Sequence, residues 1–177
     1  VELTASRRCG IQRYQYASGG TMPVIVDLEY GSECACTIQT EHDVDTVYAS
    51  AFEQVDSCTI RGYRFSNGWT PQQQVYFYTR FSSPIKKCVL YVDNRRIGEA
   101  VSAEGRSVKA MLSFENGQGE LEVRTAISSV SMEGAAANLQ AETQGKTFED
   151  IRESASGAWS RVLGQIEVAV SYTHLRA

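Results

Sequence analysis

The sequence lacks the features that mark membrane proteins and nucleic-acid-binding proteins. No apolar run approaches the roughly 20 residues that a membrane-spanning helix needs, and no signal peptide is visible. The net charge is −4 with both signs interspersed, and the basic pairs Lys86-Lys87 and Arg95-Arg96 are too short to attract nucleic acid. We therefore expect no membrane span and no nucleic-acid partner.

Histidine and paired cysteine are also scarce. The two histidines, His42 and His174, cannot make a histidine-based triad or zinc site credible. The cysteines are odd in number, and the closest two are separated by one residue rather than the two or more of zinc knuckles; they are Cys9, Cys34, Cys36, Cys58 and Cys88. We expect free thiols on strands, although export would permit a disulfide whose partners the sequence does not select.

Short runs of alternating apolar and polar residues fill the first 130 positions. The chain has 177 residues, which suits one domain that buries about 70% of its unfolded surface. The clearest alternation, over residues 108–114, places on one face Val108, Ala110, Leu112 and Phe114. Turn signals such as Asn67-Gly68 and Asp93-Asn94 separate the runs. The pattern predicts a mainly β fold, an antiparallel β-sandwich.

Helical spacing is confined to the stretch from Ser131 to Val168. One apolar stripe recurs every three or four positions, at Phe148, Ile151, Ala155, Ala158, Trp159 and Val162. Thr147 is placed to cap this helix, and Gly164 to end it as a left-handed stop. A shorter helix, from Ser131 to Glu142, ends at the Gln144-Gly145 break. We expect a two-helix connector after the sandwich.

Several segments, in a fixed order along the chain, carry specific sequence motifs. The most specific are R-G-Y-R-x-S-x-G-W at Arg61 to Trp69 and S-x-E-x-A-x-x-N-L-x-x-E at Ser131 to Glu142. The others are VELTAS with RRCGIQRYQY, VIVDLEYG, QVYFYTRFSSP, SVKAMLSFENGQGELEVRTAISSV and the helix end AWSRVLGQIEV. In this order the segments resemble the N-terminal domain of glycoside hydrolase family 92, and the resemblance covers about Val1 to Val168.

This resemblance implies a glycosidase, a calcium-dependent exo-α-mannosidase that inverts the anomeric centre and degrades mannose-containing glycans such as N-glycans or mannans. Family members are mostly exported bacterial proteins, so a periplasmic or extracellular location is expected. Their sandwich packs on an (α/α)6 barrel, which mainly supplies the catalytic carboxylates and the calcium ligands. The expected partners are therefore the glycan and the protein's own C-terminal catalytic domain.

The resemblance also sets expected boundaries. Residues 1–130 are expected to be a partial, incomplete N-terminal sandwich, and residues 131–168 the connector to a missing barrel. Residues 169–177 do not continue as the family does and are expected to be a non-native tail. The chain starts without Met, within strand-like sequence, as a fragment would. We expect this fragment to hold no catalytic residue, to bind no metal itself and to be inactive alone.

Three residues are candidates for substrate binding. Trp69 follows the Asn67-Gly68 turn, so a loop can present its ring to the C–H bonds of a sugar. The alternative is a tryptophan that closes one end of the core. Arg61 and Arg64, in the preceding strand, can donate to sugar hydroxyls, although exposed strand arginines are ordinary.

Acidic residues offer two further sets, and both are more simply explained as solvated surface. An inverting glycosidase needs two carboxyl groups about 6.5–9.5 Å apart. Asp27 and Glu29 share a strand face, and a loop carries Glu41, Asp43 and Asp45. A calcium site in that loop needs further oxygen ligands, which the sequence does not place.

Two alternatives of other classes remain. One is a stand-alone carbohydrate-binding β-sandwich without catalysis, which would bind mannosides by itself. The other is a structural or adhesive sandwich that self-associates through exposed strand edges. The helical connector argues against both, because a sandwich alone does not require it.

Overall fold

The structure is a computed structural model that describes residues 1–17, 20–30, 45–68, 70–115 and 119–166. Several sequence expectations therefore fall outside the described residues. These are the expectations for Cys34, Cys36, Glu41, His42, Asp43, Trp69 and His174 and for residues 169–177.

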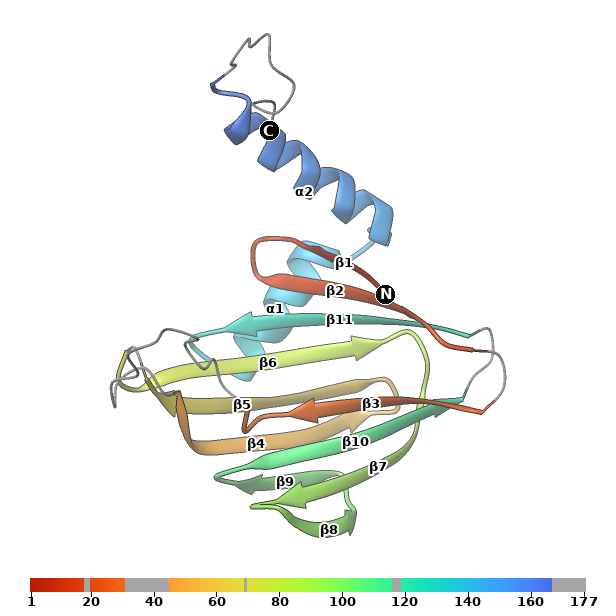
Figure 1. Cartoon of the computed structure of the whole chain (residues 1–177), viewed down its shortest axis with the longest axis vertical. Helices are drawn as coiled ribbons and strands as arrows, with labels where there is room; N and C mark the ends of the chain where they lie inside the picture. Colours follow the sequence, from red (N-terminus) through yellow and green to blue (C-terminus); the bar gives the residue numbers. More distant parts are fainter. Residues whose placement is uncertain (18–19, 31–44, 69, 116–118, 167–177) are drawn as a thin grey trace, which may run out of the picture.

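Strands of the described chain form two antiparallel sheets that face each other (Figure 1). The larger sheet has the order β1 (Glu2–Ala5), β2 (Cys9–Gln15), β11 (Glu120–Ser128), β6 (Gln73–Phe81), β5 (Thr59–Asn67), β4 (Thr46–Asp56), β9 (Ser102–Gly105). The smaller has the order β3 (Thr21–Asp27), β10 (Val108–Glu115), β7 (Ile85–Val92), β8 (Arg95–Glu99). The antiparallel β-sandwich is confirmed.

The main core lies between the two sheets, as the period-two alternation predicts. Strand β10 buries Val108, Ala110, Leu112 and Phe114 and turns its polar residues outward. From the larger sheet, Phe52 and Leu121 pack against them. Cys88 lies in the same core as a free thiol.

The two predicted helices are present. Helix α1 (Met132–Thr143) is capped by the side chain of Ser131, and α2 (Phe148–Leu163) by a capping box of Thr147 with Asp150. The expected left-handed stop at Gly164 is wrong: φ is −74° there, and its N–H bonds to Ser160 O, as in a continuing helical turn. The left-handed glycine is Gly145, after α1, with φ +70°.

A second, smaller core fixes the helices on the outer face of the larger sheet. It joins strand residues to α1 and to the first turn of α2, and consists of Cys9, Ile11, Ala126, Leu139, Phe148 and Ile151. Beyond this turn, α2 projects from the sandwich (Figure 1). The expected apolar stripe continues on its exposed part, where Trp159 is 66% and Val162 58% exposed.

Candidate functional site

A groove of about 840 Å³ runs between α1 and the outer face of the larger sheet. Its floor includes Arg61 from β5, Tyr78 and Arg80 from β6, and Arg124 from β11. Polar and small residues of α1 form its wall. This is the concave, mixed polar and apolar kind of site in which small ligands bind.

Strand alternation and register explain the floor. Arg61 lies opposite Tyr78 across the β5–β6 pair, and Arg80 lies opposite Arg124 across the β6–β11 pair. Paired residues of antiparallel strands share a face, so all four side chains point to the α1 side. Two arginines directly opposite one another would repel without neutralising partners.

Two of these three arginines are neutralised within the domain. Arg124 donates from Nε to Glu122 at 2.7 Å and from NH1 to the carbonyl of Thr143 at 3.0 Å, which satisfies the C-terminus of α1. Arg61 donates to Glu53 at 2.7 Å, and this hydrogen bond raises the pKa of Arg61. The side chain of Arg80 is exposed and forms no ion pair or hydrogen bond within the described part of the chain.

Arg64 points to the other face of β5, because three positions separate it from Arg61. It donates to the carbonyl of Leu28 at 3.2 Å, to Ser66 Oγ at 3.0 Å and to Asp45 Oδ2 at 2.9 Å. The side chains of Arg64 and Asp45 are only 18% and 14% exposed. The structure therefore does not bring Arg61 and Arg64 together, and sugar binding by Arg64 stays a prediction.

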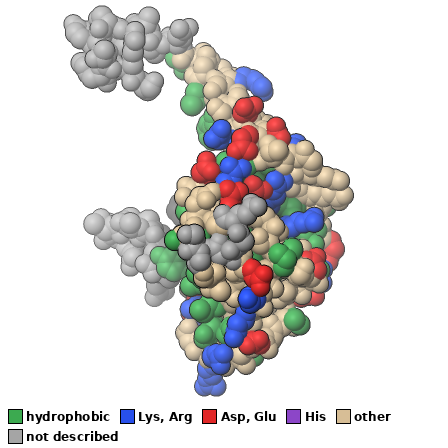
Figure 2. Space-filling model, turned by 90° about the vertical axis from the view of Figure 1, so that its right-hand side faces the viewer, with side chains coloured by type: hydrophobic (Ala, Val, Ile, Leu, Met, Phe, Trp, Pro, Cys, Tyr) green, Lys and Arg blue, Asp and Glu red, His purple; other side chains and the backbone are tan. Residues whose placement is uncertain are grey.

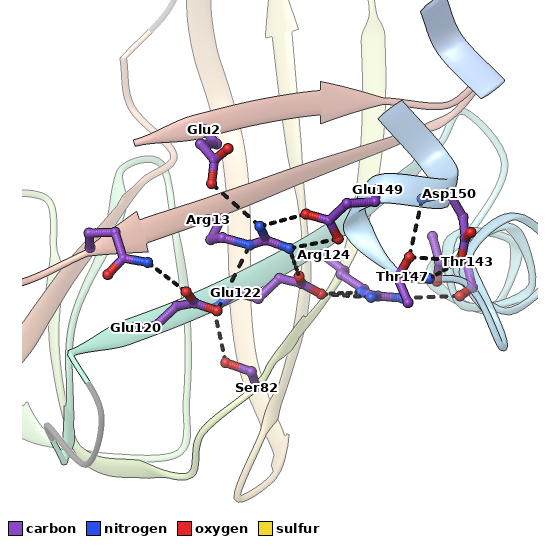
Figure 3. A network of polar contacts seen from close by, with 11 residues as sticks. Glu2, Arg13, Ser82, Glu120, Glu122, Arg124, Thr143, Thr147, Glu149 and Asp150 are labelled. Carbon is purple, nitrogen blue, oxygen red and sulfur yellow. Dashed lines mark hydrogen bonds and ion pairs between the residues drawn. The ribbon is translucent and has the colours of Figure 1, made fainter. Parts of the chain in front are cut away.

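A polar network centred on Arg13 of β2 holds the start of α2 to the sheet (Figure 3). Its guanidinium bonds both carboxylate oxygens of Glu149, at 2.9 and 3.3 Å, and lies 4.3 Å above the ring of Phe148. Glu2 and Glu122 lie 3.4 and 3.7 Å from it. The hydrogen bond with Glu149 raises the pKa of Arg13. Figure 2 shows charges of both signs gathered below α2.

A second polar contact joins α1 to the β1–β2 hairpin. The carboxylate of Glu142 accepts from Ser6 Oγ at 2.6 Å, from the backbone N–H of Arg8 at 3.0 Å and from Arg8 Nε at 2.7 Å. Burial alone would raise the pKa of Glu142, but these hydrogen bonds outweigh it and lower the pKa to about 2. Neither this contact nor the Arg13 network is readable from the sequence, because the partners lie far apart in it.

The carboxylates considered for catalysis have other partners. Lys109 Nζ lies 2.5 Å from Glu29 and 4.0 Å from Asp27, and its hydrogen bond lowers the pKa of Glu29. A lowered pKa is the opposite of what a general acid needs. Among the described residues, no group of three or more His, Cys, Asp or Glu side chains is arranged to hold a metal ion. No helix in this part of the chain is long and apolar enough to cross a membrane.

The chain was compared with known proteins. Its sequence matches the family model of the glycosyl hydrolase family 92 N-terminal domain over residues 1–128. A search of curated proteins found no significant match.

Solved structures match over almost the whole chain. The family GH92 alpha-mannosidase BT3965 from Bacteroides thetaiotaomicron aligns with a TM-score of 0.82 and 25% identity, covering 96% of this chain and 22% of that chain. The GH92 family glycosyl hydrolase ccman5 aligns with a TM-score of 0.81 at 23% identity, over 96% and 21% of the two chains. The family GH92 inverting mannosidase BT2199 from B. thetaiotaomicron aligns with a TM-score of 0.77 at 22% identity, covering 94% of this chain and 21% of that chain. The chain thus spans about a fifth of their length.

Proposed function

The chain belongs to glycosyl hydrolase family 92, whose N-terminal domain it matches over residues 1–128, and from this membership we propose that it scaffolds a longer α-mannosidase. In this proposal it is a non-catalytic domain of a calcium-dependent, inverting exo-α-mannosidase that degrades N-glycans or mannans. The parent enzyme is bacterial and exported to the periplasm or beyond. The observation that carries the proposal is the family match, supported by structural similarity that extends through the helices.

The scaffolding role is supported by how the helices are held. Arg13 and Glu142 tie α2 and α1 to the larger sheet through several hydrogen bonds each. Beyond its first turns, α2 presents Trp159, Val162 and Leu163 at 66%, 58% and 68% exposure. A catalytic domain that packs on this stripe would remove it from water, which favours association by about 25 cal/mol per Å² of apolar area.

Catalysis is placed outside this chain. Asp27 and Glu29 share Lys109, so neither is suited to be the protonated acid of an inverting pair. Calcium prefers six to eight oxygen ligands, and the described residues offer no acidic cluster that fits it. We assign the catalytic pair and the calcium ligands to the catalytic domain because family membership implies this division of roles.

The test is made on the complete protein. It is expected to release mannose from an aryl α-mannoside, to lose this activity when calcium is chelated and to regain it when calcium is restored. Proton NMR of the first product should show the β-anomer. A complete protein that hydrolyses no α-mannoside, or releases the α-anomer first, would contradict the proposal.

A further inference from the structure

We propose that the groove between α1 and the larger sheet is a binding site for a neutral oligosaccharide. That the oligosaccharide is rich in mannose rests on the proposed function, whereas the binding site itself is inferred from the geometry and chemistry of the groove. The volume of about 840 Å³ lies within the roughly 300–1,000 Å³ of ordinary ligand sites.

The apolar contact surface of the groove is Tyr78, together with small residues of α1. Tyr78 is half-buried against the second core, and its hydroxyl has no hydrogen-bond partner among the described residues. A tyrosine offers an apolar ring to sugar C–H bonds and a hydroxyl that donates to or accepts from a sugar hydroxyl. Ala136 lines the opposite wall and leaves room for a ring.

The polar groups left without partners face the same groove. Within the described chain, the side chain of Arg80 forms no ion pair. The side-chain amides of Gln140 and Gln144 form no hydrogen bond there either. Gln140 lies in the last turn of α1, and Gln144, four positions later, is the C-cap residue of this helix. A planar guanidinium and amides, which both donate and accept, suit the adjacent hydroxyl pairs of a pyranose.

The charge balance favours a neutral ligand. The lining includes three arginines, Arg61, Arg80 and Arg124, and three carboxylates, Asp56, Glu122 and Glu133, so its formal charge is zero. An anionic ligand would meet as much repulsion as attraction, and an apolar helix would leave the guanidinium and amides without partners. A polyhydroxylated neutral ligand meets neither penalty.

The experiment titrates the chain with an α-linked mannopentaose by isothermal calorimetry and locates the ligand by amide chemical-shift changes. We expect shifts at residues 78–80 and 136–144. The variant pair Arg80→Ala with Gln140→Ala is expected to weaken binding at least tenfold. Both side chains are exposed and unpaired, so the fold should persist, as circular dichroism will check. Arg96→Ala, at an exposed arginine of β8 in the other sheet, is the matched control and should bind as the parent does.

Three outcomes would overturn the proposal: no binding at millimolar mannopentaose, shifts located elsewhere, or equal loss in the Arg96→Ala control. Tighter binding of a glutamate-rich peptide than of the saccharide would also overturn it, because the site would then select anions. None of these readouts involves hydrolysis. A complete protein with mannosidase activity but an empty groove refutes only this inference, whereas an inactive complete protein refutes the proposed function.

Discussion

Charged side chains with little solvent exposure join separate elements in this domain. Glu142 joins α1 to the β1–β2 hairpin, Arg64 joins β5 to the residues that flank β3 and β4, and Arg13 joins β2 to α2. Each has several partners, which offset the cost of removing a charge from water. Removing one of these side chains takes several hydrogen bonds away from its partners at once, and this costs more than the loss of a single exposed pair.

The hydrogen bonds of Glu142 predict that the free energy of unfolding depends on pH. The folded pKa of Glu142, about 2, lies below the ordinary value of 4.5, so its stabilisation is complete above about pH 4.5 and is lost as the pH falls towards 2. Glu142→Gln should therefore lower the free energy of unfolding by about 2 kcal/mol at pH 7. The difference between parent and variant should shrink through that acid range. Urea denaturation at several pH values measures it.

The matched control is Glu115→Gln. Glu115 pairs with Lys86 at 3.0 Å, but its side chain is 76% exposed, so its loss should change stability by less than about 0.5 kcal/mol. If the two variants changed the free energy of unfolding equally at pH 7, or if the effect of Glu142→Gln did not depend on pH, the stabilising role of Glu142 would be contradicted.

The residues of the groove are only partly readable from the sequence. Sugar binding by Arg61 stays a prediction, although Arg61 does line the groove. Period-two alternation already separates it from Arg64, yet the partners of Arg64 are set by tertiary contacts that no local pattern reveals. Arg80 and Gln140 were missed, because an exposed arginine on a strand and a glutamine on a helix look ordinary until α1 is placed over β6.

Strand β5 packs closely against its neighbouring strands at Gly62. A Cβ there would lie 1.9 Å from the carbonyl oxygen of Ala51 and 2.8 Å from the ring of Phe77. Backbone cannot move away without breaking the β4–β5 pairing. The glycine thus lets a strand pass under an aromatic ring of the core.

Gly62→Ala is expected to destabilise the chain by about 3 kcal/mol, through a clash that the sheet cannot relieve. Gly10→Ala is the matched strand variant, because a Cβ at Gly10 meets nothing within 4 Å; it should be neutral or slightly stabilising. Thermal unfolding followed by circular dichroism compares them. Similar melting temperatures for the two variants would contradict the close packing described around Gly62.

Helix α2 depends on Arg13 at its first turn and on little of the described sandwich beyond it. Arg13→Ala removes the bidentate contact with Glu149 and the cation over Phe148. We expect amide hydrogen exchange of residues 151–155 to become at least fivefold faster, while exchange in the central strands stays unchanged. Arg13→Lys keeps the charge but loses the planar guanidinium, so its exchange rates should fall between those of the parent chain and those of Arg13→Ala. Unchanged exchange in Arg13→Ala would contradict the role of this network.

The longer elements follow from local pattern, but two short edge strands, β8 and β9, do not. Alternation predicted β10 and β11, and helical spacing with capping residues predicted α1 and α2. Strands β8 and β9 lie in the polar stretch of residues 95–105 and were not predicted, since each is a short edge strand with little apolar face. The Asp93-Asn94 turn that leads into them was predicted, and both residues have positive φ, 49° and 63°.

The whole molecule is a sandwich whose strand order is set by long-range pairing. Strand β11 pairs with β2, more than 100 residues earlier in the chain, and this brings both helices onto the outer face of the larger sheet. Local patterns predicted the fold class but not this order, because alternation specifies which face is buried and not which neighbour is chosen. The resemblance to family 92, which the family match confirms, predicted a sandwich followed by helices but no strand order.

In the proposed function, this domain supports catalysis by the longer protein without performing it. The most direct test compares aryl α-mannoside hydrolysis by the purified 177-residue chain and by the complete protein, both with calcium supplied. We expect turnover by the complete protein and none above background by the chain. Hydrolysis by the chain that persists through purification would contradict it.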